Sequence, residues 1–569
     1  MAIQFKLSLK NLIDKPEELL DFIDSCLKPK QKEKQENGEV FTPMNIIFEM
    51  LDNLDKHYQT ENKRSVFSEK NFKWFDPASG MGNFPVAVYL RLMEGLTNII
   101  QDEEERKKHI IENMLYMSEL NKKNVFICHQ IFNIDGKYKM NLYEGDTLEM
   151  KIEEKFDVVL GNPPYNKGGI RSSTGKKLGD KNETIWPKFT ELSLELLKPN
   201  GFLIFITPLS WLKKSHSLHE ILLKNHIIWL KLWDNSQSKA TIYADIPISL
   251  YILQNKNNKG KKTEIISILK RRNLKTESLV YLNPEHSIPL AYHNIFAKLS
   301  TFIENKNCKL EYKTKTVKSS GSKEKLPESY SIEDNLAVDT YTLKEGLLVK
   351  KTIEKHPDIN KSKLIISNKS SFRGAFIDDG RLSLTGSDKV YILGENLELI
   401  QKILSFKVCE IISHFTKYRQ DFLEKEAYNY IPDLRKLNIE DIEEDGFYEM
   451  IGFSKEELDQ IKGIQSNISI TKGNVDSDFS KKTVIELKTL IKDMGIKAPL
   501  SKLKKSELID LISSKEQIPV SVQEVVSQES LSKKTVIQLK EIIKEMGIKK
   551  AISKLKKAEL IQCIIDKKQ

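Results

Sequence analysis

The sequence predicts an α/β fold in which a doubly wound parallel sheet precedes a mixed domain and two small helical repeats. Three observations support this prediction. Strand-like apolar runs alternate with helix-like segments between residues 39 and 255, residues 256–462 show no regular pattern, and a basic segment near the end of the chain is duplicated. The 569 residues also exceed what one hydrophobic core usually holds, so we expect several domains.

Changes in composition and patterning place the domain boundaries. Polar, Ser-rich stretches indicate linkers, and helical spacing of apolar residues marks the repeats. The predicted segments are a helical lead-in (1–38), an α/β body (39–255), a less regular domain (256–462), a linker (463–479), a first repeat (480–514), a second linker (515–531) and a second repeat (532–566).

Within the α/β body, short apolar runs end in polar or glycine residues, as strands do before a turn. Strands are predicted at 72–75, 114–118, 156–161, 201–207 and 249–254, with helices at 85–96 and 186–197 between them. Alternating strands and helices indicate a parallel sheet with helices on both faces. Ligands of such sheets bind beyond the carboxyl ends of the strands.

A glycine-rich turn follows the first predicted strand. Residues 76–84 read DPASGMGNF, and a helix-like segment comes next. Gly80 and Gly82 allow a tight turn and close approach of the backbone to a ligand. The start of the helix adds bare backbone amides. Such turns are common, so this one alone indicates a ligand site without naming the ligand.

A second motif, GNPPY at 161–165, directly follows the strand-like run FDVVL. The two prolines lack N–H donors and stiffen the loop, so its carbonyls stay available as acceptors. The side-chain oxygen of Asn162 and the carbonyl of Pro163 can then both accept from an N–H donor of a ligand. Tyr165 supplies a ring that can stack on a planar group.

These two motifs resemble those of the amino-methyltransferases, in which Asn-Pro-Pro-Tyr is catalytic and the glycine loop binds the cofactor. The resemblance covers roughly residues 39–255 and implies a Rossmann-like fold that uses S-adenosylmethionine. It assigns the catalytic role to Asn162, Pro163, Pro164 and Tyr165. It also implies that the target base is flipped into the pocket and methylated by direct transfer, without a covalent intermediate.

The resemblance extends to further cofactor contacts. EVFTP (39–43) resembles the upstream motif that packs on the methionine end of the cofactor, Glu119 ends the second strand where an acid can bind ribose hydroxyls, and Asp146 resembles the residue that recognises the cofactor's adenine. Thr42 and Pro43 also suit the N-cap and first position of a helix. The predicted cofactor-binding residues are Phe41, Thr42, Pro43, Asp76, Ala78, Gly80, Gly82, Glu119, Asp146 and Asn162.

The order of the motifs resembles the γ arrangement of adenine-N6 DNA methyltransferases of restriction–modification systems. The expected substrate is therefore double-stranded DNA. Residues 256–462 would form the target-recognition domain, which ends in EKEAYNYIPDL (424–434). Tyr243 is the candidate for a second ring that stacks on the target base, and a rim or core tyrosine is the alternative. A cognate restriction endonuclease on another chain is a further expected partner.

The two basic repeats carry almost all of the net charge. They align without a gap at an offset of 52 residues and together contribute +9 of the chain's +10. Concentrated positive charge indicates a polyanionic partner. The repeats resemble SAP modules, small helix–loop–helix DNA-binding units. The lysines expected to face phosphates are Lys502, Lys504, Lys505, Lys554, Lys556 and Lys557.

Several alternatives remain open. The acceptor could be another planar nitrogen, such as cytosine-N4, an RNA base or a protein glutamine, or the chain could be an inactive DNA-binding scaffold. Five scattered cysteines without a CxxC pair favour a reducing compartment and argue against structural zinc, so no metal is predicted. The N-terminal residues lack the pattern of a signal peptide, and no apolar stretch is long enough for a membrane span. We therefore expect an intracellular protein that lies wherever its DNA is.

Overall fold

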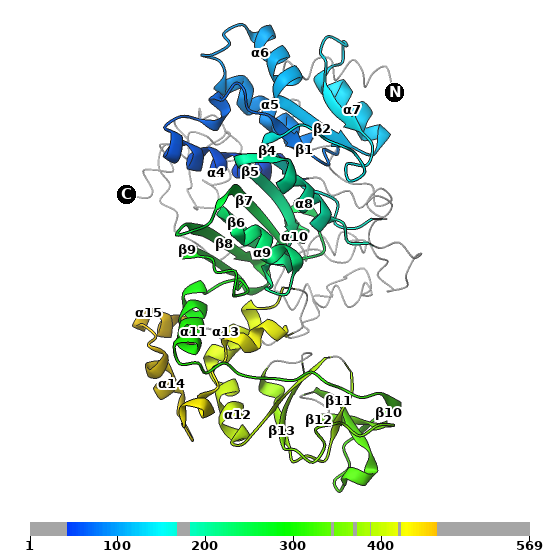
Figure 1. The fold of residues 1–569 in the computed structure, drawn as a ribbon, viewed down its shortest axis with the longest axis vertical. Helices are drawn as coiled ribbons and strands as arrows, with labels where there is room; N and C mark the ends of the chain where they lie inside the picture. The colour runs from blue at the N-terminus through cyan, green and yellow to red at the C-terminus, as the bar shows by residue number, and fades with distance from the viewer. Residues whose placement is uncertain are drawn as a thin grey trace, which may run out of the picture. The chain divides into compact units, whose positions relative to one another are not determined.

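The computed structural model describes residues 42–167, 183–342, 346–367, 372–386, 388–418 and 423–463 (Figure 1). The chain divides into two compact units, Met1–Gln465 and Ser466–Gln569, and all described residues belong to the first. The predicted lead-in, the linkers and both basic repeats lie outside the described residues. In the described part of the chain, no helix is long and apolar enough to cross a membrane.

The largest element is a nine-stranded sheet with the order β3-β2-β1-β4-β5-β7-β6-β8-β9. Its strands are β1 (Trp74–Asp76), β2 (Leu115–Glu119), β3 (Asn141–Glu144), β4 (Phe156–Gly161), β5 (Leu197–Pro208), β6 (Asn225–Trp233), β7 (Ile248–Asn257), β8 (Lys262–Leu269) and β9 (Leu274–Tyr281). Strands β1 to β5 are parallel neighbours. All five predicted strands exist, and β3 precedes Asp146 as expected.

The prediction of an entirely parallel sheet is wrong at the run 249–254. This run forms β7, which is antiparallel to both of its neighbours, β5 and β6. It reaches its place through a connection that contains one short helix, α10 (Asn235–Ile242), and then folds back beside β6. Adjacent antiparallel strands do not need the long crossover that parallel strands require.

Helices cover both faces of the sheet, which confirms the doubly wound, Rossmann-like fold (Figure 1). Apolar residues of three helices, together with Ile242 of α10, join one core cluster with the strands, and two further helices pack on β4 to β7 with residues outside that cluster. The first three are α4 (Met44–Asn62), α5 (Asn83–Gly95) and α7 (Lys122–Phe132); the other two are α8 (Trp186–Leu196) and α9 (Ser217–Lys224). A shorter helix, α6 (Glu103–His109), lies between α5 and β2 in the chain.

Helix α4 begins one residue later than the sequence suggests. Its predicted inward face is confirmed, because Ile46, Ile47, Met50 and Leu51 are buried. The N-cap, however, is Pro43, which makes no side-chain capping bond. Thr42 is therefore not the cap, and its hydroxyl instead accepts a hydrogen bond from another part of the fold, described below.

The sheet continues beyond the predicted boundary at residue 255, which falls inside β7. Strand β8 pairs in parallel with β6, and β9 pairs antiparallel with β8. The rest of the segment is mixed, as predicted. It holds a four-stranded sheet of β10 (Ser319–Lys325), β12 (Gly346–Thr352), β11 (Leu336–Thr342) and β15 (Ser383–Leu384), and a three-stranded sheet of β14 (Phe376–Asp378), β13 (Lys363–Ser367) and β16 (Lys389–Leu393).

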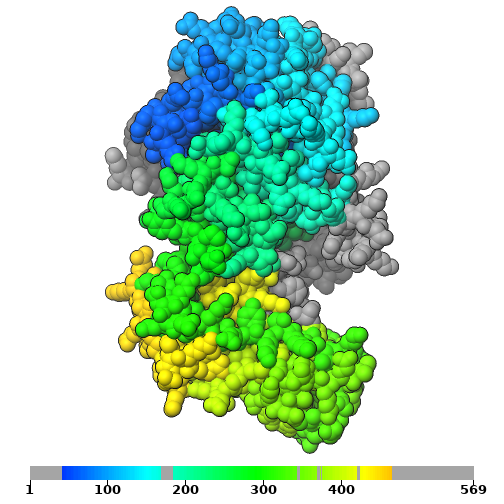
Figure 2. Space-filling view, in the orientation of Figure 1, coloured from blue at the N-terminus to red at the C-terminus, as the bar shows by residue number. Residues whose placement is uncertain are grey.

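Helices complete this second region, and they are α11 (His293–Asn305), α12 (Leu397–Ser405), α13 (Lys407–Phe415), α14 (Glu444–Ile451) and α15 (Lys455–Gly463). Figure 2 colours these segments green to yellow, and the α/β body runs from blue through cyan to green. Much of the EKEAYNYIPDL segment is buried. Its Tyr430 hydroxyl donates to the Ser287 carbonyl at 2.5 Å. This segment therefore packs against the connection that leaves β9.

Candidate active site

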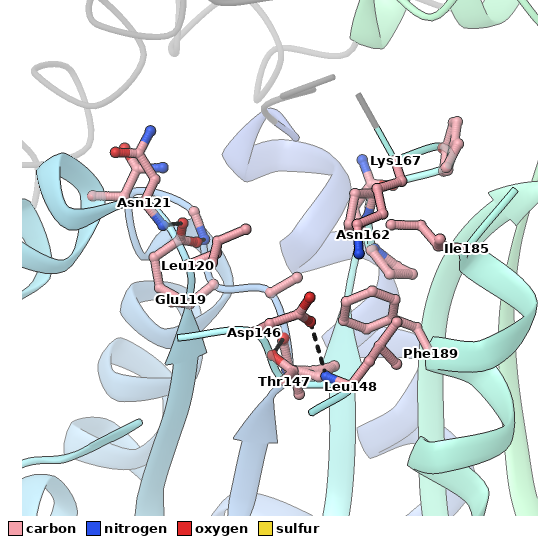
Figure 3. Close-up of a pocket in the computed structure, with 18 of the residues that line it drawn as sticks. Glu119, Leu120, Asn121, Asp146, Thr147, Leu148, Asn162, Lys167, Ile185 and Phe189 are labelled. Carbon is pink, nitrogen blue, oxygen red and sulfur yellow. Dashed lines mark hydrogen bonds between the residues drawn. The ribbon is translucent and has the colours of Figure 1, made fainter. Parts of the chain in front are cut away.

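A cavity of about 840 Å³ lies at the carboxyl ends of β1 to β4 (Figure 3). The glycine turn, the ends of β2 and β3, the NPPY motif and the start of α8 all contribute to its wall. The lining residues are 42, 77–81, 83, 84, 119–122, 124, 146–149, 162–167, 183, 185, 188 and 189. The sheet thus brings together segments that are up to 147 residues apart in sequence, at the edge where parallel sheets bind ligands.

The glycine turn adopts the predicted conformation. Gly80 and Gly82 have φ of 53° and 91°, the left-handed region that favours glycine. Gly80 lines the cavity, whereas a Cβ at Gly82 would point at the Cys128 sulfur (3.4 Å) and Phe132 (3.5 Å) instead of at a ligand. Gly82 therefore faces α7 and not the cavity. Its position does not support the prediction that it contacts the cofactor.

Most amides of the turn are already bonded within the protein. The Gly80 amide donates to Glu119 Oε2 at 2.7 Å, and the Ser79 amide donates to the Ser118 carbonyl at 3.0 Å. The Ala78 amide donates to Asp76 Oδ1, also at 3.0 Å. These three residues precede α5, which begins at Asn83, so their bonds leave the predicted bare amides at the helix start untested. They hold the turn in place, and Ala78 and Gly80 still contribute surface to the cavity.

Asp76 lies beneath the turn and does not line the cavity. It is 1% exposed, and burial raises the pKa of its carboxyl from 3.8 to about 8. Among the described residues, its Oδ2 has no hydrogen-bond partner. Its contact with Ala78 makes it an anchor of the turn, so the prediction that Asp76 binds cofactor directly is replaced by an indirect role.

Replacing Asp76 with asparagine is expected to change how stability depends on pH. Because the folded-state pKa is raised, the folded protein holds this proton up to about pH 8 while the unfolded chain releases it near 4. The contribution of Asp76 to the free energy of unfolding therefore falls as pH rises from about 4 to about 8. The substituted amide keeps an acceptor for the Ala78 amide and does not titrate. The melting temperature of Asp76→Asn minus that of the parent protein should increase between pH 5 and pH 9. A difference that stays constant over this range would contradict the raised pKa of Asp76.

Two acids stand at neighbouring strand ends, as predicted. Glu119 ends β2, and its two carboxylate oxygens accept from the amides of Gly80 and Asn121, each at 2.7 Å. Asp146 follows β3, and its Oδ1 accepts from the Leu148 amide at 3.1 Å. Figure 3 shows Asp146 between Glu119 on one side and Phe189 and Asn162 on the other. Both carboxylates line the cavity, where they can meet donors of a ligand.

The NPPY motif forms the opposite wall. Asn162 Nδ2 donates to the Thr42 hydroxyl at 3.3 Å, so Thr42, two residues before α4, orients the amide. Pro163 and Pro164 also line the cavity. Tyr165 is half-buried, and its hydroxyl is buried with no partner among the described residues. Burial raises the pKa of this phenol, which stays neutral, and its ring borders the cavity.

The wall also contains residues that the sequence reasoning missed. The Ile185 amide donates to the Tyr165 carbonyl at 3.1 Å, which brings the start of α8 beside NPPY. Ile185 and Phe189 then face the cavity (Figure 3). Their four-residue spacing places them on one helix face, but so does the spacing of many core residues. Leu120 is 69% exposed although apolar, and its position directly after Glu119 is the one sequence signal that could have identified it.

Some predicted site residues lie elsewhere. Tyr243 is 55% exposed, occupies the C-cap of α10 and does not line the cavity. It lies after α10, in the connection between β6 and β7. Pro43 does not line the cavity either. Phe41 and the six lysines of the repeats lie outside the described residues.

Comparison with known proteins gives one family match within the α/β body and two curated relatives. The family described as Eco57I restriction-modification methylase matches residues 42–239. An uncharacterized adenine-specific methylase of Mycoplasma pneumoniae is 25% identical over 253 residues, covering 32% of this chain and 57% of the relative. The type II methyltransferase M.BsuBI of Bacillus subtilis is 24% identical over 240 residues, covering 39% of this chain and 45% of the relative. The chain thus spans about half the length of the curated relatives it matches.

Solved structures show weak similarity. A nuclease-deletion mutant of the Type ISP restriction-modification enzyme LlaGI, in complex with a DNA substrate mimic, is 13% identical with a TM-score of 0.40, covering 69% of this chain and 46% of that one. A modification subunit of a putative type I restriction enzyme from Vibrio vulnificus is 14% identical with a TM-score of 0.33. The match covers 61% of this chain and 65% of that subunit. The family match is the stronger finding. Residues 42–239, which match the Eco57I restriction-modification methylase family, hold the glycine turn, both acids and NPPY.

Proposed function

We propose that this chain is a DNA methyltransferase that transfers a methyl group from S-adenosylmethionine to the exocyclic amino group of adenine. The observation that carries the proposal is the shared cavity, in which the glycine turn and two strand-end acids face the NPPY motif. The family match over the same residues and the two adenine-specific or type II methyltransferase relatives support it.

The cavity suits the proposed cofactor in size and chemistry. Its volume of about 840 Å³ lies within the range of small-molecule sites, with room for a flipped base beside the cofactor. Glu119 and Asp146 offer carboxylate oxygens to hydroxyl and amino donors, and Leu120 and Phe189 offer apolar surface to a purine ring. When bound, S-adenosylmethionine supplies an electrophilic methyl group on its sulfonium.

The chain's own residues prepare the target nitrogen. Asn162 Oδ1 and the Pro163 carbonyl accept hydrogen bonds from the adenine amino group, which draws electron density toward that nitrogen and exposes its lone pair. Thr42 holds the other end of the Asn162 amide, so the acceptor is oriented before the substrate arrives. Such preorganised polar groups are a main source of catalytic acceleration.

The target base must leave the duplex before it reaches these acceptors. Base flipping costs a few kcal/mol of unstacking. The Tyr165 ring, which borders the cavity beside Asn162, offsets part of this cost by stacking. Ile185 and Phe189 close the same wall and exclude water from the reacting atoms.

The proposal is tested by producing the chain in a bacterial host and sequencing the host DNA for modified bases. N6-methyladenine at one sequence motif supports it. N4-methylcytosine would move the activity to the other amino base, and unmodified DNA together with methylated RNA or protein would reject a DNA substrate. Binding of S-adenosylmethionine by calorimetry separates an enzyme from an inactive scaffold.

We further propose that residues 256–462 read the target sequence and that the enzyme serves in a restriction–modification system of γ arrangement, with its nuclease on another chain. The support is the motif order and a mixed region that continues directly from the catalytic sheet. The two basic repeats are proposed to bind the DNA backbone, on the strength of their charge.

Deleting residues 470–569 is expected to weaken DNA binding and to leave the methylated motif unchanged. Lysine neutralises phosphates without reading bases, and each lost phosphate contact lowers the slope of log K against log salt by about 0.9. Salt titrations and modified-base maps of the full-length and truncated proteins check this. An altered motif, or equal slopes, would contradict it.

A further inference from the structure

A ladder of buried hydroxyl groups lies directly under the glycine turn. The Thr147 hydroxyl donates to the Pro77 carbonyl at 2.6 Å, and the Ser118 hydroxyl lies 2.8 Å from the Thr147 hydroxyl. Ser118 is 0% exposed and Thr147 4% exposed. The ladder joins the ends of β2 and β3 to the first residue of the turn after β1.

The direction of each hydrogen bond in the ladder follows from the chemistry of its ends. A carbonyl can only accept, so the single hydroxyl proton of Thr147 is committed to Pro77. Ser118 must therefore be the donor to Thr147. Thr147 is thus the one ladder residue that contacts the turn by donating, and the proposed cofactor function does not use its side chain.

We infer that Thr147 is a positioning residue that sets the shape of the cofactor-binding turn through Pro77. The inference rests on the proposed function. Two other hydrogen bonds fix the residues that follow Pro77. The Ser79 amide donates to the Ser118 carbonyl, and the Gly80 amide donates to the Glu119 carboxylate. Thr147 fixes the beginning of the same stretch, so that residues 77 to 80 are held at both ends. Without its hydroxyl, the buried Pro77 carbonyl loses this partner, and the Ser118 hydroxyl keeps only its weak contact with the Met150 sulfur at 3.9 Å.

The test compares the full-length protein with Thr147→Val, which keeps the shape of the side chain and removes the hydroxyl, and with Thr147→Ser, which keeps the hydroxyl. Binding of S-adenosylhomocysteine, the methyl-free product, is measured by calorimetry. Thr147→Val should raise the Kd about tenfold, the equivalent of about one net hydrogen bond, and Thr147→Ser should restore it. Ser118→Ala should have the smaller effect, because Thr147 keeps its bond to Pro77.

The sheet offers a matched control in Thr207→Val. Thr207 is another strand-end threonine with 0% exposure, and its hydroxyl pairs with the Ser249 hydroxyl at 3.2 Å, away from the cavity lining. Thr207→Val should lower the melting temperature about as much as Thr147→Val does. It should leave the Kd for S-adenosylhomocysteine unchanged. An equal rise in Kd in both variants would show a general loss of stability and overturn the inference.

Amide hydrogen exchange of the ligand-free protein provides a second readout. Thr147→Val should speed exchange in the peptide covering residues 76–84, and Thr207→Val should not. Unchanged exchange with a raised Kd would make Thr147 a direct ligand contact and reject the positioning role. If the parent protein does not bind S-adenosylhomocysteine, the proposed function fails and this inference with it, whereas equal binding by parent and Thr147→Val overturns the inference alone.

Discussion

Replacing Asn162 with alanine is expected to lower the rate of methyl transfer by about 10²- to 10³-fold, the loss typical of one preorganised hydrogen-bonding group. The side-chain acceptor for the adenine amino group disappears, while the glycine turn and both acids stay. Cofactor affinity should therefore change little. A labelled-methyl assay gives the rate, and calorimetry with S-adenosylmethionine gives the Kd.

A second variant controls for loss of packing at the same wall. Phe189→Leu trims a ring that also lines the cavity but leaves Asn162 in place, so its rate should fall far less. Activity of Asn162→Ala above a few per cent of the parent would remove Asn162 from the catalytic role. A loss of cofactor binding as large as the loss of rate would make it a cofactor ligand.

Gly161→Ala is expected to disrupt the junction between the glycine turn and NPPY. A Cβ at this position would lie 2.7 Å from Asp76 Oδ1, closer than packed atoms allow, and 3.4 Å from its Cγ. Since Asp76 anchors the turn through Ala78, relief of the clash must displace either that anchor or the residue before Asn162. We expect a loss of stability of about 1–3 kcal/mol from overpacking, together with weakened cofactor binding. Urea unfolding and calorimetry measure the two effects.

The cause of this effect can be isolated with two further variants. Gly260→Ala places a methyl group where no atom lies within 4 Å, so it tests the change from glycine without the clash. The double variant Gly161→Ala with Asp76→Ala removes the clashing carboxylate, and its loss should be smaller than the sum of the single losses. Additive losses would show that Gly161 and Asp76 do not compete for the same space.

The parts of the site that could be predicted from sequence are those whose signal is local. The turn at 76–84, Glu119, Asp146 and NPPY each follow directly after a strand-like run, and a parallel sheet gathers strand ends at one edge. Their convergence on one cavity therefore followed from the α/β pattern alone.

The features of the site that were not predicted depend on long-range contacts, which the local sequence pattern does not contain. The amides of Ser79 and Gly80 are bonded to the end of β2, 39 residues away, so they could not be identified as occupied from the turn itself. Thr42 had good N-cap chemistry, but Asn162 uses its hydroxyl from 120 residues away. Tyr243 was placed near the base by motif order, and it is not among the residues that line the cavity.

The continuation of the sheet through β8 and β9 limits how this chain can be recombined with its relatives. A chimera joined at residue 255 would separate β8 from β6, leaving the main-chain groups of β6 unpaired and open to association with other chains. A junction after Tyr281 would keep all nine strands with the catalytic motifs. Exchange of sequence specificity between relatives should therefore be engineered at that later point.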